Sequence, residues 1–283
     1  MLHIALLNLM PNKEETEADF ARICAESAEP VRFVLTKMSS HVTRHASPEH
    51  MALYSGSEVV CRLHDDGTQP LDGFIVSGAP FDWVDFTDVD YWPELCHLMD
   101  WLRCRCIPTL YVCWGAQAAL RYFHGISRIE EYPHKLSGIF PQQVLHPDRP
   151  LFDGIVTPLC IPHSRHTSMV NSQIDACPDV IVLARSADTG ISIVECRGGL
   201  EFYLIGHQEY NLHTLDNEYR RDVSRGLPVL PPRHYYLDDD PTRPVVDTWQ
   251  ANGRRLFANW LNHYCALRIP SGRQPSGEPS GKK

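Results

Sequence analysis

Residues 107–120 read I-P-T-L-Y-V-C-W-G-A-Q-A-A-L. The apolar run before Cys113 predicts a buried strand, and the small residues from Trp114 onward predict a helix. A strand that breaks at one nucleophile and turns at once into a helix is a nucleophile elbow, which lifts the reactive atom off the sheet edge. The positive end of the helix dipole favours the thiolate, the form of cysteine that attacks. The segment therefore predicts an α/β sheet with Cys113 as nucleophile.

A second apolar run, F-Y-L-I-G (202–206), ends at His207. Because residues two apart in extended backbone point to the same side, we expect Glu209 to orient the imidazole of His207. Cys113, His207 and Glu209 would then act as nucleophile, base and orienting carboxylate. The alternatives are a buried structural thiol at 113 and an ordinary histidine at 207, one of 15 in the chain. The combined pattern favours acyl transfer through a cysteine.

Two places in the sequence offer donors for an oxyanion hole. The backbone N–H of Trp114 directly follows the nucleophile, which is the usual position of the first donor. The turn S-G-A-P (77–80) follows another predicted strand, and Gly78 and Ala79 would supply the second donor. The alternative for this turn is a plain loop at the end of a strand.

Apolar runs and helical spacings alternate along the chain, which predicts a mostly parallel sheet with helices on both faces, as in flavodoxin-like folds. In such a sheet the site lies beyond the carboxyl ends of the strands, where Cys113 and His207 fall. The predicted strands are residues 3–9, 31–37, 72–77, 109–112, 180–183, 191–195 and 201–205, with the last two joined by the turn R-G-G (197–199). The predicted helices are residues 13–26, 91–104, 212–224 and 249–267.

We expect one catalytic domain over residues 1–269. The proline-rich segment 227–244 is predicted to be an extended but ordered loop, because Tyr235, Tyr236 and Leu237 give it side chains to bury. Residues 270–283 are of low complexity and are predicted to be disordered.

Composition narrows the classes of function. A chain of 283 residues with 43% hydrophobic and 22% charged residues is typical of a globular protein. The net charge of −9 leaves no basic surplus to neutralise phosphates, so we expect no nucleic-acid partner. No apolar run approaches the roughly 20 residues of a membrane span, and the sequence shows no signal peptide. These features predict a cytoplasmic protein without a membrane partner.

The 10 cysteines are scattered, and none pair as C-x-x-C, which indicates a reducing compartment. Cys104 and Cys106 are separated by one residue, and this close spacing makes them candidate metal ligands. No second ligand pair follows them with zinc spacing, and H-E-x-x-H is absent. We therefore expect no metal site.

Four polar residues outside the triad are candidates for substrate contacts. Lys135 precedes a glycine turn, and Ser164 lies in the polar stretch P-H-S-R-H (162–166). Glu218 and Arg221 are three residues apart on a predicted helix, so they share one face. Together they could clasp the ammonium and carboxylate of an amino acid; the alternative for each residue is a solvated or paired surface charge.

Y-V-C-W-G-A-Q-A and G-H-Q-E-Y resemble the two motifs of the class I glutamine amidotransferase superfamily, with Tyr111 in place of a glycine and Gln208 in place of a proline. More specifically, the chain resembles the homoserine O-acyltransferases of methionine biosynthesis. The matching segments are N-L-M-P-N-K-E-E-T-E (8–17), S-G-A-P-F-D-W-V-D-F (77–86), D-V-D-Y-W-P-E-L (88–95), C-W-G-A-Q-A-A-L (113–120), K-L-S-G (135–138), P-H-S-R (162–165), G-H-Q-E-Y (206–210) and N-W-L-N-H-Y (259–264).

This resemblance implies a ping-pong reaction in which Cys113 takes an acyl group from acetyl-CoA or succinyl-CoA, with no permanently bound cofactor. His207 then deprotonates the hydroxyl of L-homoserine, which attacks the thioester. By position, Lys135, Ser164, Glu218 and Arg221 fall where the family contacts its substrates, and Arg221 would bind the α-carboxylate and Glu218 the amino group. L-serine is an alternative acceptor, because one methylene is worth only about 1–3 kcal/mol in a pocket.

The acyl donor is predicted from the residue at position 82, which is Asp82. Family members with glycine at this place tend to use succinyl-CoA and those with glutamate acetyl-CoA, and aspartate is closer to glutamate. Like charges about 4 Å apart repel by roughly 1 kcal/mol in water and about 4 kcal/mol at intermediate dielectric, which would disfavour the succinyl carboxylate. We therefore expect acetyl-CoA.

The competing hypotheses are a glutamine amidase or hydrolase built on the same triad, and a non-catalytic binding member of the superfamily. We expect a homodimer, because dimers are the commonest assembly of soluble enzymes.

Overall fold

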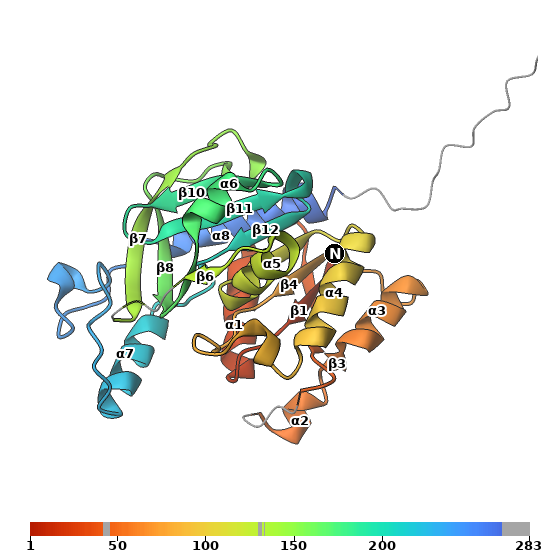
Figure 1. Ribbon diagram of the computed structural model, residues 1–283, viewed down its shortest axis with the longest axis horizontal. Helices are drawn as coiled ribbons and strands as arrows, with labels where there is room; N and C mark the ends of the chain where they lie inside the picture. The colour runs from red at the N-terminus through yellow and green to blue at the C-terminus, as the bar shows by residue number, and fades with distance from the viewer. Residues whose placement is uncertain (42–45, 130–131, 133, 268–283) are drawn as a thin grey trace, which may run out of the picture.

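The computed structural model describes residues 1–41, 46–129, 132 and 134–267 (Figure 1). Ten strands of this part form one sheet, and its first six strands run parallel. In spatial order the parallel strands are β3 (Ser55–Gly56), β2 (Val31–Lys37), β1 (Leu2–Leu7), β4 (Gly73–Val76), β5 (Thr109–Val112) and β12 (Glu201–Leu204). The prediction of a mostly parallel sheet is confirmed.

The sheet continues beyond β12 with four antiparallel strands, which the sequence pattern did not predict as a group. They are β11 (Gly190–Cys196), β10 (Val180–Ser186), β7 (Leu136–Val144) and β8 (Leu159–Arg165). The predicted turn Arg197–Gly199 joins β11 to β12, and a connection this short permits only an antiparallel pair. A separate two-stranded ladder pairs β6 (Arg128–Ile129) with β9 (Ser168–Met169).

Helices cover both faces of the sheet (Figure 1). On one face α4 and α5 pack over β4 and β5, and on the other α1 and α8 pack against each other. The helices are α1 (Lys13–Ile23), α2 (Pro48–Met51), α3 (Ser57–Asp65), α4 (Trp92–Cys104), α5 (Trp114–His124), α6 (Asn171–Ala176), α7 (Thr214–Ser224) and α8 (Gln250–Trp260). Across the described residues, we find no helix with the length and apolar character that crossing a bilayer requires.

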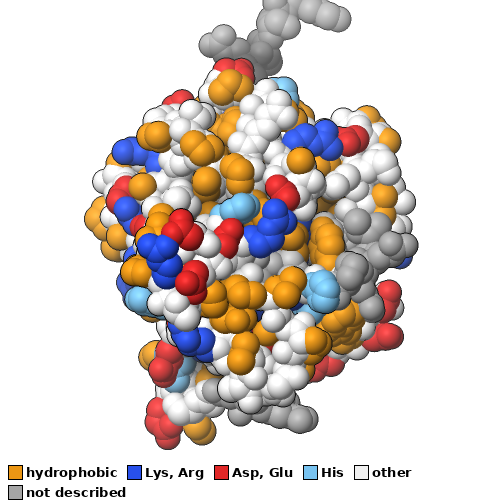
Figure 2. All heavy atoms as spheres, turned by 90° about the vertical axis from the view of Figure 1, so that its left-hand side faces the viewer, with side chains coloured by type: hydrophobic (Ala, Val, Ile, Leu, Met, Phe, Trp, Pro, Cys, Tyr) orange, Lys and Arg blue, Asp and Glu red, His pale blue; other side chains and the backbone are white. Residues whose placement is uncertain are grey.

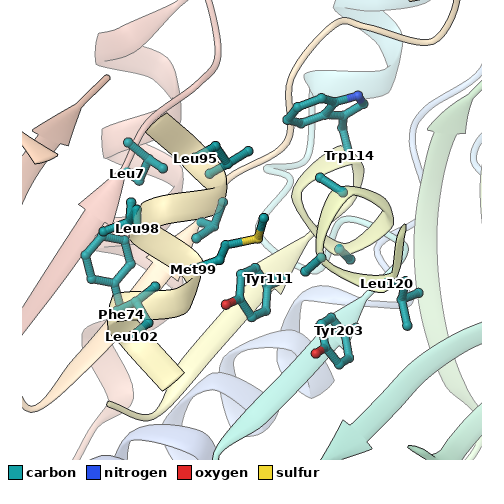
Figure 3. Packing of buried hydrophobic residues seen from close by; sticks show 14 of the residues in the cluster. Leu7, Phe74, Leu95, Leu98, Met99, Leu102, Tyr111, Trp114, Leu120 and Tyr203 are labelled. Carbon is teal, nitrogen blue, oxygen red and sulfur yellow. The ribbon is translucent and has the colours of Figure 1, made fainter. Parts of the chain in front are cut away.

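The core under α4 and α5 positions Cys113. Figure 3 shows the α4 side chains Leu95, Leu98, Met99 and Leu102 packed towards the sheet, with Tyr111 of β5 beside them. Tyr111, which replaces the motif glycine, is fully buried, and its ring stacks on that of Tyr203 at 5.2 Å between centroids. The replacement therefore contributes to the core.

Most of the predicted helices and strands are present in the structure, but many begin or end at different residues from those predicted. Strand 31–37 and strand 109–112 match the structure, whereas the predicted helix 249–267 is α8 followed by a π-helical turn, Leu261–Cys265. Helix α3 and the long strands β7 and β8 were missed, because each has a mixed polar and apolar sequence. Residues of β7 and β8 form strands because they pair with each other and with neighbouring strands, which is a tertiary effect.

The predicted loop 227–244 buries Tyr235 and Tyr236 against Trp249 and Leu215, as expected. The prediction that Leu237 is buried is wrong, because 41% of this residue is exposed. It begins a 3-10 turn, Leu237–Asp239, which carries its side chain away from the tyrosines' cluster. The prediction for residues 270–283 lies outside the described residues.

Gly115 allows the first turn of α5 to approach the end of β4. A Cβ atom at this position would lie 2.7 Å from the carbonyl oxygen of Ser77 and 3.0 Å from that of Val76. Helix propensity alone would make Gly115→Ala stabilising by about 1 kcal/mol. The steric conflict with backbone atoms outweighs this gain, because neither oxygen can move without disturbing the strand end.

We therefore expect Gly115→Ala to lower the free energy of unfolding by about 1–3 kcal/mol, measured by urea denaturation. Arg121→Ala, an exposed position on the same helix, should stay within about 0.5 kcal/mol of the parent. A stabilised Gly115→Ala protein would contradict the close approach.

Candidate functional site

Cys113 sits on a sharp turn between β5 and α5. Its backbone has φ 49° and ψ −115°, a strained conformation for a non-glycine residue and typical of a nucleophile elbow. The N–H of Cys113 donates to the carbonyl of Leu204 at 2.7 Å, and its carbonyl accepts from the N–H of Gln117 at 3.0 Å. The strain is thus held by the sheet on one side and by the helix on the other.

His207 and Glu209 follow β12, the neighbour of β5 in the sheet. Nδ1 of His207 lies 2.7 Å from Oε1 of Glu209, and both side chains are buried. The predicted contact is therefore present, but the predicted reason for it is wrong. The N–H of Tyr210 donates to the carbonyl of His207 at 3.3 Å, so residues 207–210 form a turn instead of an extended segment.

The charges around His207 favour its protonated form. Burial alone would lower the pKa of His207, but the negative charges of Cys113 and Glu209 and the hydrogen bonds to them raise it well above its usual value. The ring of Tyr210 stacks on the imidazole, with centroids 4.1 Å apart. The arrangement suits an imidazolium paired with a thiolate, as in activated cysteine nucleophiles.

Both predicted sources of oxyanion donors lie beside the nucleophile. Trp114 is the first residue of α5, where a backbone N–H has no partner within the helix. A Cβ atom on Gly78 would lie 3.2 Å from Cβ of Cys113 and 3.5 Å from Cε1 of His207. Ala79 follows in the same turn, and its carbonyl accepts from the N–H of Phe81 at 3.0 Å. A side chain at 78 would therefore require Cys113 to shift by a few tenths of an ångström.

Three of the four predicted substrate contacts meet around one carboxylate. Oε2 of Glu218 accepts from Nζ of Lys135 at 2.8 Å and also from the hydroxyl of Ser164. Oε1 of Glu218 accepts from the hydroxyl of Tyr210 at 3.1 Å. Burial would raise the pKa of Glu218, but Lys135, Ser164 and His207 lower it, so the carboxylate stays ionised. Tyr210 therefore connects this cluster to His207.

Arg221 pairs with its neighbour in the chain, Asp222. Its guanidinium pairs with Asp222 at 2.8 Å, and Asp222 also lies 3.5 Å from Nζ of Lys135. The side chain of Arg221 is 47% exposed, and the charge of Glu218 contributes to raising its pKa. The clasp formed by Glu218 and Arg221 stays a prediction. Figure 2 shows acidic and basic side chains interspersed on the face that includes α7.

Asp82 lies in the loop after the Gly78 turn. Its Oδ1 accepts from the N–H of His166 and from the hydroxyl of Thr167, both at 3.3 Å. Thr167 in turn contacts Oε1 of Gln117, one turn into α5, at 3.4 Å. Asp82 is therefore held between the elbow helix and the end of β8.

Arg128 fixes the backbone of the Asp82 loop. Its Nη1 donates to the carbonyls of Phe81, Asp82 and Val84 at 3.2, 3.0 and 2.9 Å, and its guanidinium lies 4.1 Å from the ring centroid of Phe86. Burial lowers the pKa of Arg128, which the charges of Asp82, Asp85 and Cys113 oppose.

Arg165 is a fully buried arginine near the same groups. It donates to the hydroxyl of Ser168 at 2.7 Å and to the carbonyl of Thr189 at 2.8 Å. Burial lowers its pKa, and Tyr132, Cys113 and Asp82 oppose this shift. The side of the site that contains Asp82 thus combines one carboxylate with two guanidinium groups.

Residues of helix α1 contact the segment that contains His207 and Glu209. Arg22 donates to the backbone carbonyl of Glu209, and Asn211 donates to Asp19 at 3.0 Å. Burial and the charge of Glu209 raise the pKa of Asp19 to about 6, against the opposing hydrogen bond from Asn211. A pocket beside the triad is lined by Met10, Thr16, Asp19, Phe20, Ser77, Gly78, His207, Glu209 and Tyr210.

Four residues that contact this site were not predicted from the sequence: Arg22, Asp19, Arg128 and Tyr210. Tyr210 had a usable signal, because it belongs to the same motif as His207, whereas Arg22 and Arg128 reach the site from elements far away in the sequence. The described residues also include His163, fully buried beside Gly206, whose ring nitrogens have no hydrogen-bond partner among them. Nothing in its local sequence indicated this placement.

Solved structures with a similar fold include two glutamine amidotransferases. One from Methylobacillus flagellatus has a TM-score of 0.57 at 15% identity and covers 92% of this chain and 93% of its own. Another, from Thermotoga maritima, has a TM-score of 0.58 at 10% identity and covers 92% of this chain and 96% of its own. At these identities the likeness concerns the fold alone.

Curated relatives match nearly the whole sequence. A homoserine O-acetyltransferase from Brevibacillus brevis is 40% identical over 269 residues, which cover 95% of this chain and 86% of the relative. One from Bacteroides thetaiotaomicron is 39% identical over 271 residues, with the same coverage of both chains. The profile of the family described as "Homoserine O-succinyltransferase" matches residues 1–271. This chain therefore belongs to the homoserine O-succinyltransferase family.

Proposed function

We propose that this enzyme transfers an acetyl group from acetyl-CoA to the side-chain hydroxyl of L-homoserine, in methionine biosynthesis. Homoserine acyl transfer follows from family membership. The observation that supports a cysteine mechanism is the elbow thiol beside a histidine whose pKa is raised by Cys113 and Glu209. The same site could serve a glutamine amidase, as in the fold's relatives, but no contact in this site favours that function.

In the first half-reaction the thiolate of Cys113 attacks the carbonyl carbon of the acyl-CoA. The oxyanion that develops accepts hydrogen bonds from the N–H groups of Trp114 and of the Gly78–Ala79 turn. The bond between the acyl carbon and the sulfur of CoA breaks, and the imidazolium of His207 gives its proton to the departing thiolate. The products are free CoA and an acyl thioester on Cys113.

In the second half-reaction neutral His207 takes the proton of the homoserine hydroxyl, and the oxygen attacks the thioester. The bond to Cys113 breaks, which releases the O-acyl product and restores the thiolate–imidazolium pair. Glu209 holds the histidine in the tautomer that presents Nε2 to the reaction. Glu218 receives the amino group and Arg221 the α-carboxylate, and the hydrogen bond from Tyr210 to Glu218 sets this amino-acid site next to the base.

The choice of acetyl rests on Asp82 and on the relatives. The relatives named above are homoserine O-acetyltransferases, whereas the family description names succinyl, so membership alone does not select the donor. A negative charge at 82 disfavours the distal carboxylate of a succinyl group. The assembly as a homodimer also stays a prediction.

The test of the reaction is a two-by-two assay of acetyl-CoA or succinyl-CoA with L-homoserine or L-serine. We expect acetyl-CoA with L-homoserine to give the highest kcat/KM, and intact-mass analysis to show an acetyl adduct on Cys113. Cys113→Ala should lose the adduct and at least about a thousandfold of activity. Cys104→Ser, an exposed thiol, is the control. Glutamine hydrolysis without acyl-CoA, or no adduct with any acyl-CoA, would overturn the proposal.

Glu209→Gln should move the alkaline limb of the pH profile for Cys113 acylation to lower pH. Glu209 helps to raise the pKa of His207, and the reactive ion pair is lost as pH rises through that pKa. Removing the charge lowers the pKa, so the imidazolium deprotonates earlier. The rate of CoA release over a pH series measures the limb. Glu26→Gln, a surface change of the same kind, should leave the limb in place, and an unmoved limb in Glu209→Gln would contradict the assignment.

Asp82→Asn should reduce discrimination against succinyl-CoA while it keeps an acceptor for His166 and Thr167. Loss of about 1 kcal/mol of repulsion corresponds to about a fivefold change in the ratio of kcat/KM values for the two donors, and a desolvated site would give more. The matched control is Asp85→Asn in the same loop, an exposed carboxylate that accepts from Thr87. A ratio that changes equally in both variants would exclude Asp82 as the determinant.

A further inference from the structure

A second group of potential ligand atoms lies at the far end of α5. His124, Cys177 and Asp179 each present one ligand atom, and these atoms all lie within 4.8 Å of one another. His124 ends α5, and Cys177 directly follows α6. Because α5 is 11 residues long, this group is separated from Cys113 by about 16 Å along the helix. We propose that His124, Cys177 and Asp179 bind a zinc ion.

The donor set and its spacing suit zinc. A thiolate, an imidazole and a carboxylate are its usual protein ligands, and three of them leave the fourth tetrahedral position to water. Nδ1 of His124 lies 3.7 Å from Sγ of Cys177. Bonds of about 2.0–2.3 Å in tetrahedral geometry place neighbouring ligand atoms roughly 3.5 Å apart, so this pair needs little movement. Asp179 is exposed and Cys177 half-buried, which gives the ion access from solvent.

The other side of the imidazole has the partners that a metal-bound histidine needs. Coordination through Nδ1 leaves the proton on Nε2, which must find an acceptor. Nε2 lies 3.5 Å from the hydroxyl oxygen of Tyr203 and 3.7 Å from Sγ of Cys196. Nη2 of Arg103, which can only donate, also lies 3.5 Å from Nε2, so coordination through Nδ1 requires this guanidinium group to shift away. The Tyr203 hydroxyl donates its own proton to Glu201 at 2.6 Å, so its oxygen can accept from the histidine.

The local charges are compatible with a cation. The guanidinium of Arg103 is a positive charge beside His124. Arg103 itself is matched by two hydrogen bonds of 2.6 Å to Glu201. The carboxyl end of α5 contributes a negative dipole end, and the thiolate and carboxylate balance the two charges of zinc.

Zinc at this site would join the end of the nucleophile's helix to the segment between α6 and β10. Its expected effect is on stability, because the site is remote from the triad. Local sequence patterns do not indicate this site, because His124 and Cys177 are 53 positions apart in the chain.

The test uses the full chain with Cys104, Cys106 and Cys113 changed to Ser. Cys104 and Cys106 are exposed thiols, and Cys113 with His207 could itself bind a thiophilic metal. The chelator-stripped protein is titrated with Co²⁺, whose thiolate charge-transfer absorption reports a cobalt–sulfur bond, and then with Zn²⁺ in competition. We expect one equivalent of Co²⁺ with this absorption, displaced by Zn²⁺.

Adding Cys177→Ser should abolish the absorption, and Asp179→Asn should weaken binding at least about tenfold. Asp175→Asn, a neighbouring exposed carboxylate on α6, should bind as the parent does. Zn²⁺ should also raise the Tm of the parent but not that of Cys177→Ser. No thiolate absorption in the parent, or absorption that survives Cys177→Ser, would overturn the proposal and leave an ordinary S–H···N hydrogen bond between Cys177 and His124.

Discussion

The parallel pairing of β5 with β12 is the constraint on which the site depends. Val112 is in register with Leu204, and the N–H of Cys113 continues that ladder to the carbonyl of Leu204 at 2.7 Å. Both strands end at the same edge of the sheet, so Cys113 and His207 meet there although they are far apart in sequence. The strain at Cys113 persists because this hydrogen bond and the packing of Gly115 against β4 fix the backbone on both sides.

Burial makes the charges at this edge interdependent. His207 is 4% exposed and Glu209 6%, so each charge is stable only while its partner is in place. The second charged cluster depends on the first, because the Tyr210 ring that stacks on His207 also donates to Glu218. A displaced Tyr210 would loosen His207 and Glu218 together. Arg22 limits such movement by holding the carbonyl of Glu209 to α1.

The sequence predicted the parts of this arrangement that local pattern determines. Apolar runs ending at Cys113 and His207 located two neighbouring strands, and the contact from His207 to Glu209 follows from two residues in one turn. Arg22 and Arg128 could not be found this way, since their partners at 209 and 81–84 lie on other elements. Strands β7 and β8 were missed for a similar reason, because the partner strand decides their pairing.

The effect of the Asp82 charge on an acyl group depends on the arginine side chains around it. Two guanidinium groups oppose that charge, and each is already engaged: Nη1 of Arg128 by three loop carbonyls, and Arg165 by Ser168 and the carbonyl of Thr189. Nη1 of Arg128 cannot turn to meet a ligand's carboxylate without releasing the loop that contains Asp82, whereas Nε and Nη2 have no hydrogen-bond partner among the described residues. Coulomb energy falls with distance and with dielectric, so discrimination between donors depends on how near Asp82 and the arginines lie to the acyl group. The rigidity that Arg128 gives the loop is therefore what would let a single carboxylate select the acyl donor.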